Sequence, residues 1–120
     1  MFSSEKKANS LALGLLAAAG LLSGCKSLPA SKPEALFSVE EARGQQVFHV
    51  KCAKCHYPTT QRGLHGPGLQ ALTKLKAMPS GAPPSDERLT QTILHGHGMM
   101  DAIPVEDADL QDLLVYLHTL

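Results

Sequence analysis

The chain contains few large aromatic side chains. Its 120 residues include no tryptophan, two tyrosines and three phenylalanines. A chain of this length has room for one small domain, and small domains with little apolar bulk usually need a metal, a cofactor or a disulfide to be stable. The composition therefore predicts a single domain that takes part of its core from a bound group.

The sequence also lacks a net charge and an apolar run long enough to span a membrane. Its eleven basic and eleven acidic residues balance, which gives no reason to expect a nucleic-acid partner. The apolar run from Leu11 to Leu22 would form about 18 Å of helix, whereas a bilayer core is ~30 Å thick. Because Lys6 and Lys7 precede the run, it is typical of a secretory signal peptide.

The run ends in LSGC, Leu22 to Cys25, which resembles the lipobox of bacterial lipoproteins. The resemblance implies that the signal peptide, residues 1–24, is removed and that the Cys25 sulfur carries a diacylglyceryl group. Acyl chains would attach the protein to a membrane. We expect the inner or outer membrane of a bacterial cell envelope, with the protein on the periplasmic side. An ordinary signal peptide followed by a free cysteine is the alternative.

The residues after this cysteine predict a tether and then a small domain. Residues 25–36 contain two prolines together with serines and other small residues, a composition that is typical of a flexible linker. The folded domain is expected over residues 37–120, where the helical patterns and the remaining motifs lie.

A close cysteine pair, Cys52 and Cys55, is compatible with a metal site, a redox disulfide or covalently attached haem. A structural zinc site usually requires four ligands, and the third cysteine of the chain is Cys25. His95 and His97 could complete such a set, although alternate residues are not the usual spacing. A thioredoxin-like disulfide would follow a strand, whereas the residues before the pair have a helical period.

The next residue, His56, completes the pattern Cys-x-x-Cys-His. This pattern is the attachment signature of c-type haem, in which the thiols of Cys52 and Cys55 would add to the porphyrin vinyl groups. The histidine beside them is then positioned as the proximal ligand of the iron. A haem would also supply the apolar bulk that the core lacks.

Three segments of the chain have a helical pattern, and no segment of the chain has a convincing strand pattern. They cover residues 38–48, 85–94 and 106–120, and the last has leucines at the i, i+3, i+4 and i+7 spacing of one helix face. A tight turn and a short helix are expected over residues 66–75. The sequence therefore predicts an all-α domain.

One glycine predicts where two of these helices meet. Gly44 lies inside the first helix, where glycine costs about 1 kcal/mol relative to alanine. We therefore expect another backbone to come close at this position. The leucine face of the last helix needs cover, and Tyr116 would lie at the notch that Gly44 and Phe48 leave.

Together these motifs resemble the class I cytochrome c family from Ala42 to Leu117: ARGQQVFHVKCAKCH is followed by GPGL, ILHGHGMM and DLLVYL. The resemblance implies a small cytochrome c fold, with three main helices and a short one around one covalent haem c, and with N- and C-terminal helices that cross. It also implies that the Pro67 carbonyl accepts a hydrogen bond from the His56 ring nitrogen that does not face the iron.

The family usually takes its distal iron ligand from a methionine within Gly-x-Met-Pro. The Gly-x-Met alignment places Met100 in this role, with Met99 as its competitor, and Asp101 stands where the family often has proline. His95 and His97 are rival ligands, because imidazole also binds haem iron. Their glycine neighbours favour positions on a surface loop.

The expected function is one-electron transfer by a membrane-tethered monohaem cytochrome with His56 and Met100 as axial ligands. Its partners would be redox proteins that donate and accept electrons, with no small-molecule substrate and no enzymatic activity of its own. One alternative is an electron-transfer subunit of a larger oxidoreductase. Another is a module that binds ligands or reacts with peroxide through a labile sixth ligand, for which Asp101 is the only support.

Overall fold

The computed structural model describes residues 24–120, so the signal peptide expected over residues 1–24 lies outside the described residues except for its last position. In chain order the elements are η2 (Glu34–Leu36), α2 (Val39–Lys51), η3 (Leu72–Lys74), α3 (Asp86–His95) and α4 (Asp107–Leu117).

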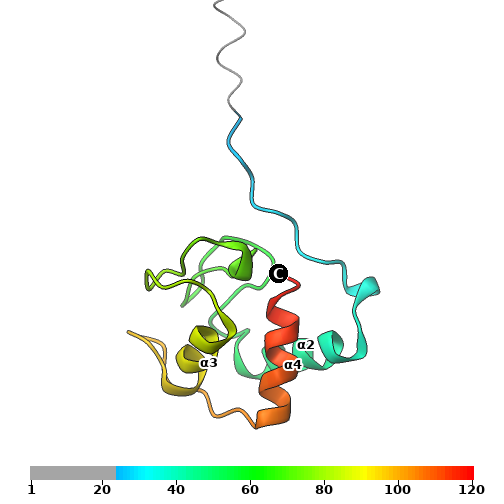
Figure 1. The fold of residues 1–120 in the computed structure, drawn as a ribbon, viewed down its shortest axis with the longest axis vertical. Helices are drawn as coiled ribbons and strands as arrows, with labels where there is room; N and C mark the ends of the chain where they lie inside the picture. The colour runs from blue at the N-terminus through cyan, green and yellow to red at the C-terminus, as the bar shows by residue number, and fades with distance from the viewer. Residues whose placement is uncertain (1–23) are drawn as a thin grey trace, which may run out of the picture.

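The arrangement is that of three α-helices around one small core. Figure 1 shows α2 and α4 crossing, with α3 and the long connection between α2 and α3 on one side of the crossing. No β-strand forms in the described part of the chain. The predicted all-α fold is confirmed, and a single 3₁₀ turn, η3, forms within the segment where a short helix was expected. No helix of residues 24–120 is long and apolar enough to cross a membrane.

Helix α2 begins with a complete capping box. The Ser38 hydroxyl accepts a hydrogen bond from the Glu41 backbone N–H at 3.2 Å, and the Glu41 carboxylate accepts one from the Ser38 N–H at 2.6 Å. These bonds satisfy two of the donors that a helix start leaves without partners. The first residues of α2 are therefore fixed in position ahead of the turn that carries the cysteine pair.

Helices α2 and α4 touch at Gly44, as predicted. A Cβ atom at this position would collide with the backbone of Asp112 and with Cβ of Tyr116, so the two helices approach more closely than any side chain allows. One turn further along α2, Phe48 is fully buried, and its ring centroid lies 5.5 Å from that of Tyr116. The crossing therefore depends on Gly44, which has no side chain to separate the helices, and on Phe48, whose ring fills the space beside it.

An ion pair spans the same crossing on its solvent side. Arg43 donates two hydrogen bonds to the Asp112 carboxylate, from Nε at 2.6 Å and from Nη2 at 3.2 Å. The guanidinium hydrogen bonds and charge lower the pKa of Asp112, and the carboxylate raises that of Arg43. Two parallel bonds of this kind fix direction as well as distance, so the pair defines how α2 is rotated against α4.

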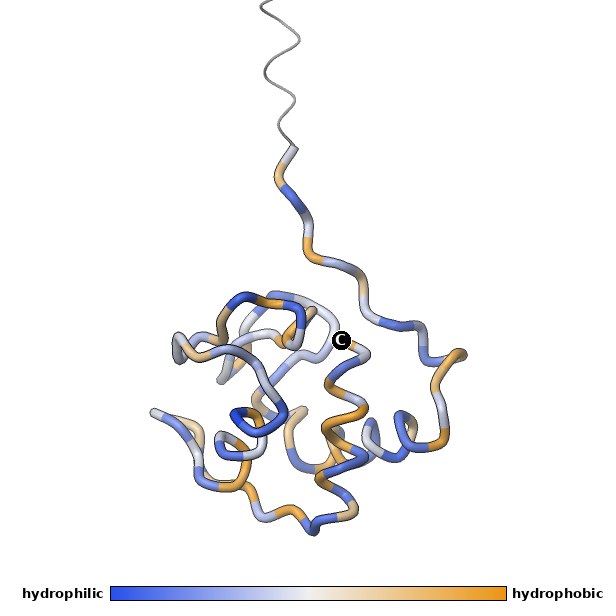
Figure 2. Tube along the Cα trace, viewed as in Figure 1, coloured by the Kyte–Doolittle hydropathy of each residue, from blue (hydrophilic) through white to orange (hydrophobic). Residues whose placement is uncertain are grey.

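The core lies between the crossing helices and α3. Its buried apolar members are Phe48, Leu72, Met78, Leu89, Ile93, Leu110, Leu113, Tyr116, Leu117 and Leu120. Figure 2 shows hydrophobic residues along much of α4, which supplies the largest share of this cluster. At the surface, His118 Nε2 lies 2.7 Å from Asp86 Oδ1, which joins the end of α4 to the start of α3.

The segment before α2 lies against the domain from residue 29 onwards. The Lys32 N–H donates to the Thr119 carbonyl at 2.7 Å, and the Pro29 carbonyl accepts from Gln70 Nε2 at 3.1 Å. The Phe37 ring packs edge-on against Tyr116, with 5.9 Å between centroids. We refer to residues 29–37 as the strap. The tether predicted over residues 25–36 stays a prediction, and in the structure backbone and aromatic groups of residues 29–37 have partners on the domain.

Candidate functional site

The cysteine pair lies in the turn that ends helix α2. The Cys52 N–H donates to the Phe48 carbonyl at 2.8 Å, and the Cys52 carbonyl accepts from the N–H groups of Cys55 at 3.0 Å and His56 at 3.1 Å. Both thiols are free and half-buried. Burial, and then the neighbouring charge of Cys55, raise the pKa of the Cys52 thiol to about 11. The turn therefore holds two thiols and an imidazole within five consecutive residues.

The His56 ring has a defined orientation and tautomer. Its Nδ1 lies 2.8 Å from the Pro67 carbonyl oxygen. A carbonyl only accepts hydrogen bonds, so Nδ1 must carry the proton and Nε2 keeps a free lone pair. A hydrogen bond of this kind also makes the free nitrogen a stronger base. The arrangement leaves one ring nitrogen free to bind a metal, and the hydrogen bond joins the two residues for which the family resemblance implied it.

Gly66 leaves space for this ring. A Cβ atom at Gly66 would collide with Cε1 and approach both nitrogens of His56. The Gly66 N–H also donates to the Cys55 carbonyl at 2.8 Å, which closes the loop between the cysteine pair and Pro67. The sequence pattern singled out the proline of this turn and not the glycine before it, although the steric requirement falls on the glycine.

The two candidate distal methionines differ in exposure. His97 and Met100 exchange both backbone hydrogen bonds, each at 2.9 Å, in a two-residue turn. Gly98 occupies this turn with a φ of 57°, a left-handed conformation that favours glycine. Met99 lies at its tip and is 95% exposed, whereas Met100 is partly buried. The turn therefore gives the two thioethers different environments.

The site is continuous with the apolar core. Cys52, Ala53 and Leu69 pack against the buried cluster, so Cys52 meets apolar side chains on the inner side of the turn. The loop that carries the methionines is joined to α3 because the Ile103 N–H donates to the Ile93 carbonyl at 2.8 Å. Both candidate ligand loops are thus fixed to the same helical frame.

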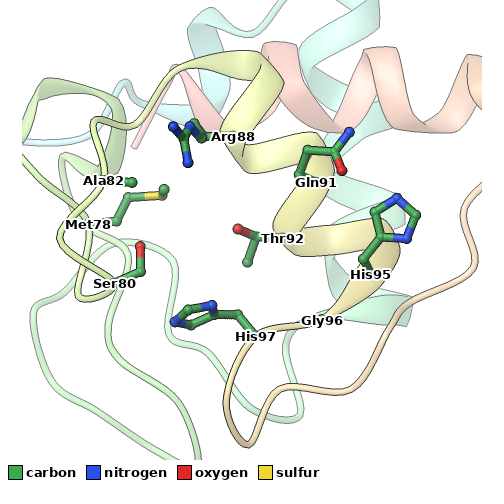
Figure 3. Close-up of a pocket in the computed structure, with 9 residues that line it drawn as sticks. All are labelled: Met78, Ser80, Ala82, Arg88, Gln91, Thr92, His95, Gly96 and His97. Carbon is green, nitrogen blue, oxygen red and sulfur yellow. The ribbon is translucent and has the colours of Figure 1, made fainter.

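A separate cavity of about 300 Å³ lies between α3 and the loop around residue 80. Figure 3 shows Arg88 and Thr92 of α3 across the cavity from Met78 and Ser80, and Gln91 of the same helix also lines it. The other residues that line it are Ala82, His95, Gly96 and His97. None of the thiols, His56 or Met100 contributes to it, so the cavity is distinct from the turn at the end of α2. No sequence motif indicated it.

The rival histidines belong to this cavity. His95 ends α3 and His97 begins the methionine turn, and both are exposed. Within residues 24–120, neither joins Cys52 and Cys55 in a group of three or more metal-binding side chains. Met78, which the sequence left as a packing residue, is buried in the core at 9% exposure.

A known protein family matches the part of the chain that contains the candidate site. The family model described as cytochrome c oxidase, cbb3-type, subunit III matches residues 39–117. This range includes the three helices, the cysteine pair with its histidine, and the methionine turn. The chain belongs to this family of class I c-type cytochromes, which confirms the resemblance drawn from its motifs. A search of curated proteins finds no match to the chain.

The residues present fit the covalent haem c that this family implies. Cys52 and Cys55 are adjacent in one turn, as attachment to the two vinyl groups of one porphyrin requires. His56 offers a free Nε2, and Gly66 leaves room beside its ring. A cytochrome c domain of this kind indicates haem-based electron transfer rather than conventional enzyme catalysis.

Proposed function

We propose that the protein is a lipid-anchored monohaem cytochrome that carries one electron at a time between redox proteins on the periplasmic side of a bacterial cell envelope. The observation that carries this proposal is the hydrogen bond from His56 to Pro67, immediately beside the two free thiols. It gives the histidine the tautomer and direction of a permanent iron ligand. No small-molecule substrate is needed for this function.

Each residue of the site has one role in the proposal. Cys52 and Cys55 would form the thioether bonds to the haem, His56 Nε2 would be the proximal ligand, and the Met100 sulfur would be the distal ligand. Haem iron, when bound, supplies a couple between ferric and ferrous states. The loops that carry His56 and Met100 are hydrogen-bonded to the helices, which would limit the rearrangement that accompanies a change of charge.

The exposure of the methionines supports Met100 over Met99. A distal ligand must lie on the inner side of its loop, where solvent is excluded from the bond that it forms. Met100 is partly buried beside the backbone bridge to His97, whereas Met99 projects from the tip at 95% exposure. Asp101, which replaces the proline common in the family, follows the bridge and is exposed.

Optical spectra of the purified holoprotein test the ligand assignment. We expect the ferric protein to show the absorption band of sulfur-to-iron charge transfer, and the ferrous protein not to bind CO. Met100→Leu should lose the band and bind CO, while the matched variant Met99→Leu should behave as the wild type. Ready binding of CO by the wild type would contradict the carrier function and favour the ligand-binding alternative.

The lipid anchor is supported by the LSGC sequence and by the position of Cys25. The thiol of Cys25 is free and exposed, ahead of the first residue that contacts the domain. We expect the intact mass of the mature protein to include a diacylglyceryl group and the protein to remain with the membrane fraction. Cys25→Ser should release it into the soluble fraction. An unmodified Cys25 in a soluble wild-type protein would contradict the anchor.

A second candidate function is an electron-transfer subunit of a larger oxidoreductase. It is favoured by the description of the matching family, which names a subunit of a cbb3-type oxidase. The chemistry of the site would be the same, but the interface with the partner would be permanent. Isolation of the protein from mild detergent, followed by size measurement, distinguishes the two: a free carrier runs as a small protein, and a subunit remains in a large complex.

A further inference from the structure

The strap is part of the folded domain, and it limits how far the anchor can move. Its first contact is the bond from Gln70 Nε2 to the Pro29 carbonyl at 3.1 Å. Three residues, 26–28, separate this contact from Cys25. Since an extended chain spans at most ~3.6 Å per residue, the Cys25 backbone lies within about 14 Å of this contact.

Four further contacts hold the strap along its length. The Lys32 N–H donates to the Thr119 carbonyl at 2.7 Å, and the Lys32 ammonium pairs with Glu41 at 2.7 Å. The Glu34 carboxylate accepts from Gln45 Nε2 at 2.6 Å, and the strap ends with the aromatic contact to Tyr116. The Ser31 hydroxyl oxygen is shielded from solvent and has no partner among the described residues. Backbone, charged and apolar groups all contribute to holding the strap in place.

The surface around the start of the strap is basic. We call the surface at Gln70, Lys74, Thr119 and Leu120 the strap face. Lys76 follows Lys74 by two residues in the sequence. Lys74 Nζ donates to a main-chain oxygen of Leu120 at 2.7 Å, next to Thr119, whose carbonyl accepts from the Lys32 N–H of the strap. Both lysines are exposed.

No acidic residue opposes these charges from nearby sequence. Residues 42–85 contain no aspartate or glutamate. Of the two carboxylates near the strap, Glu41 is paired with the Lys32 ammonium, whereas Glu34 accepts a hydrogen bond from the neutral Gln45 amide and keeps its negative charge. Lys26, between the anchor cysteine and the strap, adds a further positive charge. Basic groups close to a lipid anchor are attracted to anionic phospholipid headgroups.

We propose that the strap holds the domain on the membrane in one orientation, with the strap face against anionic phospholipid headgroups. The inference rests on the lipid anchor at Cys25 that the proposed function includes. It adds that the domain does not rotate freely on its anchor, because the short free segment and the docked strap fix which face is turned to the lipid. The direction of the haem plane relative to the bilayer is then also fixed.

Polarised absorption of the haem tests this orientation. The full-length lipid-modified holoprotein is placed in supported bilayers of equal parts phosphatidylcholine and phosphatidylglycerol, and the Soret band is measured in two polarisations. We expect a dichroic signal for the wild type. A ten-residue Gly/Ser insertion between Ser27 and Leu28 leaves the strap docked but lengthens the free segment, and should abolish the signal. The double variant Lys32→Gln, Gln70→Ala should weaken it by releasing the strap.

A second set of variants tests the lipid-facing charge. Lys74→Gln with Lys76→Gln should reduce the dichroism of the wild type in the anionic bilayer. The matched control Arg88→Gln removes a charge from α3 and should leave the dichroism unchanged. Equal dichroism in phosphatidylcholine alone and in the anionic mixture would overturn the assignment of this face to the headgroups.

The failure of the anchor and the failure of the orientation can be told apart. A soluble protein with an unmodified Cys25 would overturn both. A lipid-modified, membrane-bound protein whose haem gives no dichroic signal would overturn this inference alone. The amide hydrogen exchange of Lys32, which does not depend on the bilayer, separates an undocked strap from a docked strap on a freely rotating domain.

Discussion

The environment of His56 is set by two small groups on the facing loop. The Pro67 carbonyl fixes the ring by a hydrogen bond, and Gly66 leaves the space in which the ring lies. Neither residue would touch the iron, yet together they determine which nitrogen carries a proton and in which direction the other nitrogen points. Supporting contacts of this kind affect metal affinity by about 10- to 100-fold.

Substitution of Gly66 should therefore change the position of the His56 ring while leaving histidine as the proximal residue. The methyl group of Gly66→Ala would displace the His56 ring or lengthen its bond to Pro67. We expect the variant holoprotein to contain a larger fraction of high-spin iron than the wild type, measured by its optical spectrum at neutral pH. In the control Gly63→Ala the added carbon meets a single carbonyl oxygen at 3.3 Å, and the spectrum should remain unchanged. Identical spectra for Gly66→Ala and wild type would show that the loop accommodates the methyl group.

At the scale of the elements, the crossing of α2 and α4 is the contact on which the domain depends. The helices meet at Gly44, are flanked by the rings of Phe48 and Tyr116, and are joined at the surface by Arg43 and Asp112. The helix that leads into the cysteine pair is thus positioned by the helix that supplies the largest share of the core.

Gly44→Ala should lower the free energy of unfolding of the holoprotein. The intrinsic helix preference of alanine favours the change by about 1 kcal/mol, but overpacking usually costs about 1–3 kcal/mol and here the collision is with backbone atoms. We expect net destabilisation, measured by denaturation in guanidinium chloride. Gln46→Ala, at an exposed position of the same helix, is the matched control and should not destabilise. Greater stability of Gly44→Ala would show that the helices can separate at little cost.

The ion pair predicts a dependence on pH. The hydrogen bonds from Arg43 hold the pKa of Asp112 below its usual 3.8, so the unfolded chain binds a proton more readily than the folded one. The stabilisation is fully present above the unfolded pKa and is lost as the pH falls through the lower folded value. Arg43→Gln should therefore be less stable than the wild type at neutral pH, and this difference should vanish in strong acid.

Unfolding of the two proteins across the acidic range measures this difference. Arg88→Gln, which removes a guanidinium from α3, is the control and should show no comparable loss of the difference on acidification. A gap between wild type and Arg43→Gln that persists unchanged to the lowest pH would mean that the arginine stabilises the crossing by packing rather than by its charge.

Local sequence patterns predicted the elements and the cysteine turn because each depends on residues that are close in the chain. The Cys-x-x-Cys-His spacing, the serine caps of α2 and α3, and the leucine face of α4 are of this kind. Gly44 was informative for another reason. Glycine destabilises a helix interior, so its presence there indicates that another part of the chain packs closely against it. The end of α4 was predicted less well, because the N–H groups of Thr119 and Leu120 bond to carbonyls only three residues back, those of Tyr116 and Leu117.

The docking of the strap on the domain could not be predicted from local sequence patterns. Its prolines and serines have the composition of a linker, and the partners of Pro29 and Lys32 are Gln70 and Thr119, far away in the sequence. The cavity beside α3 could not be predicted for the same reason, because the residues that line it come from separate segments of the chain. Contacts of this kind depend on how the helices pack and leave no periodic signal in the chain.

At the scale of the whole molecule, the strap should behave as part of the cooperative fold. The Lys32 amide is bonded to the Thr119 carbonyl, so we expect it to exchange its hydrogen slowly in the holoprotein, as measured by NMR. The Ser27 amide, ahead of the strap, should exchange at the rate of an unfolded chain. Exchange of Lys32 as fast as that of Ser27 would show that the strap is free in solution.

The bond between Lys32 and Thr119 also has a consequence for the order of events during synthesis. It joins residues separated by nearly the whole domain, and contacts of such separation form late because a long loop must close first. The strap can dock only after Thr119 has been made and α4 has met α2. If Cys25 carries the lipid that we propose and export precedes folding, the anchor would reach the membrane before the strap docks, and docking of the strap would then set the orientation of the domain on the lipid.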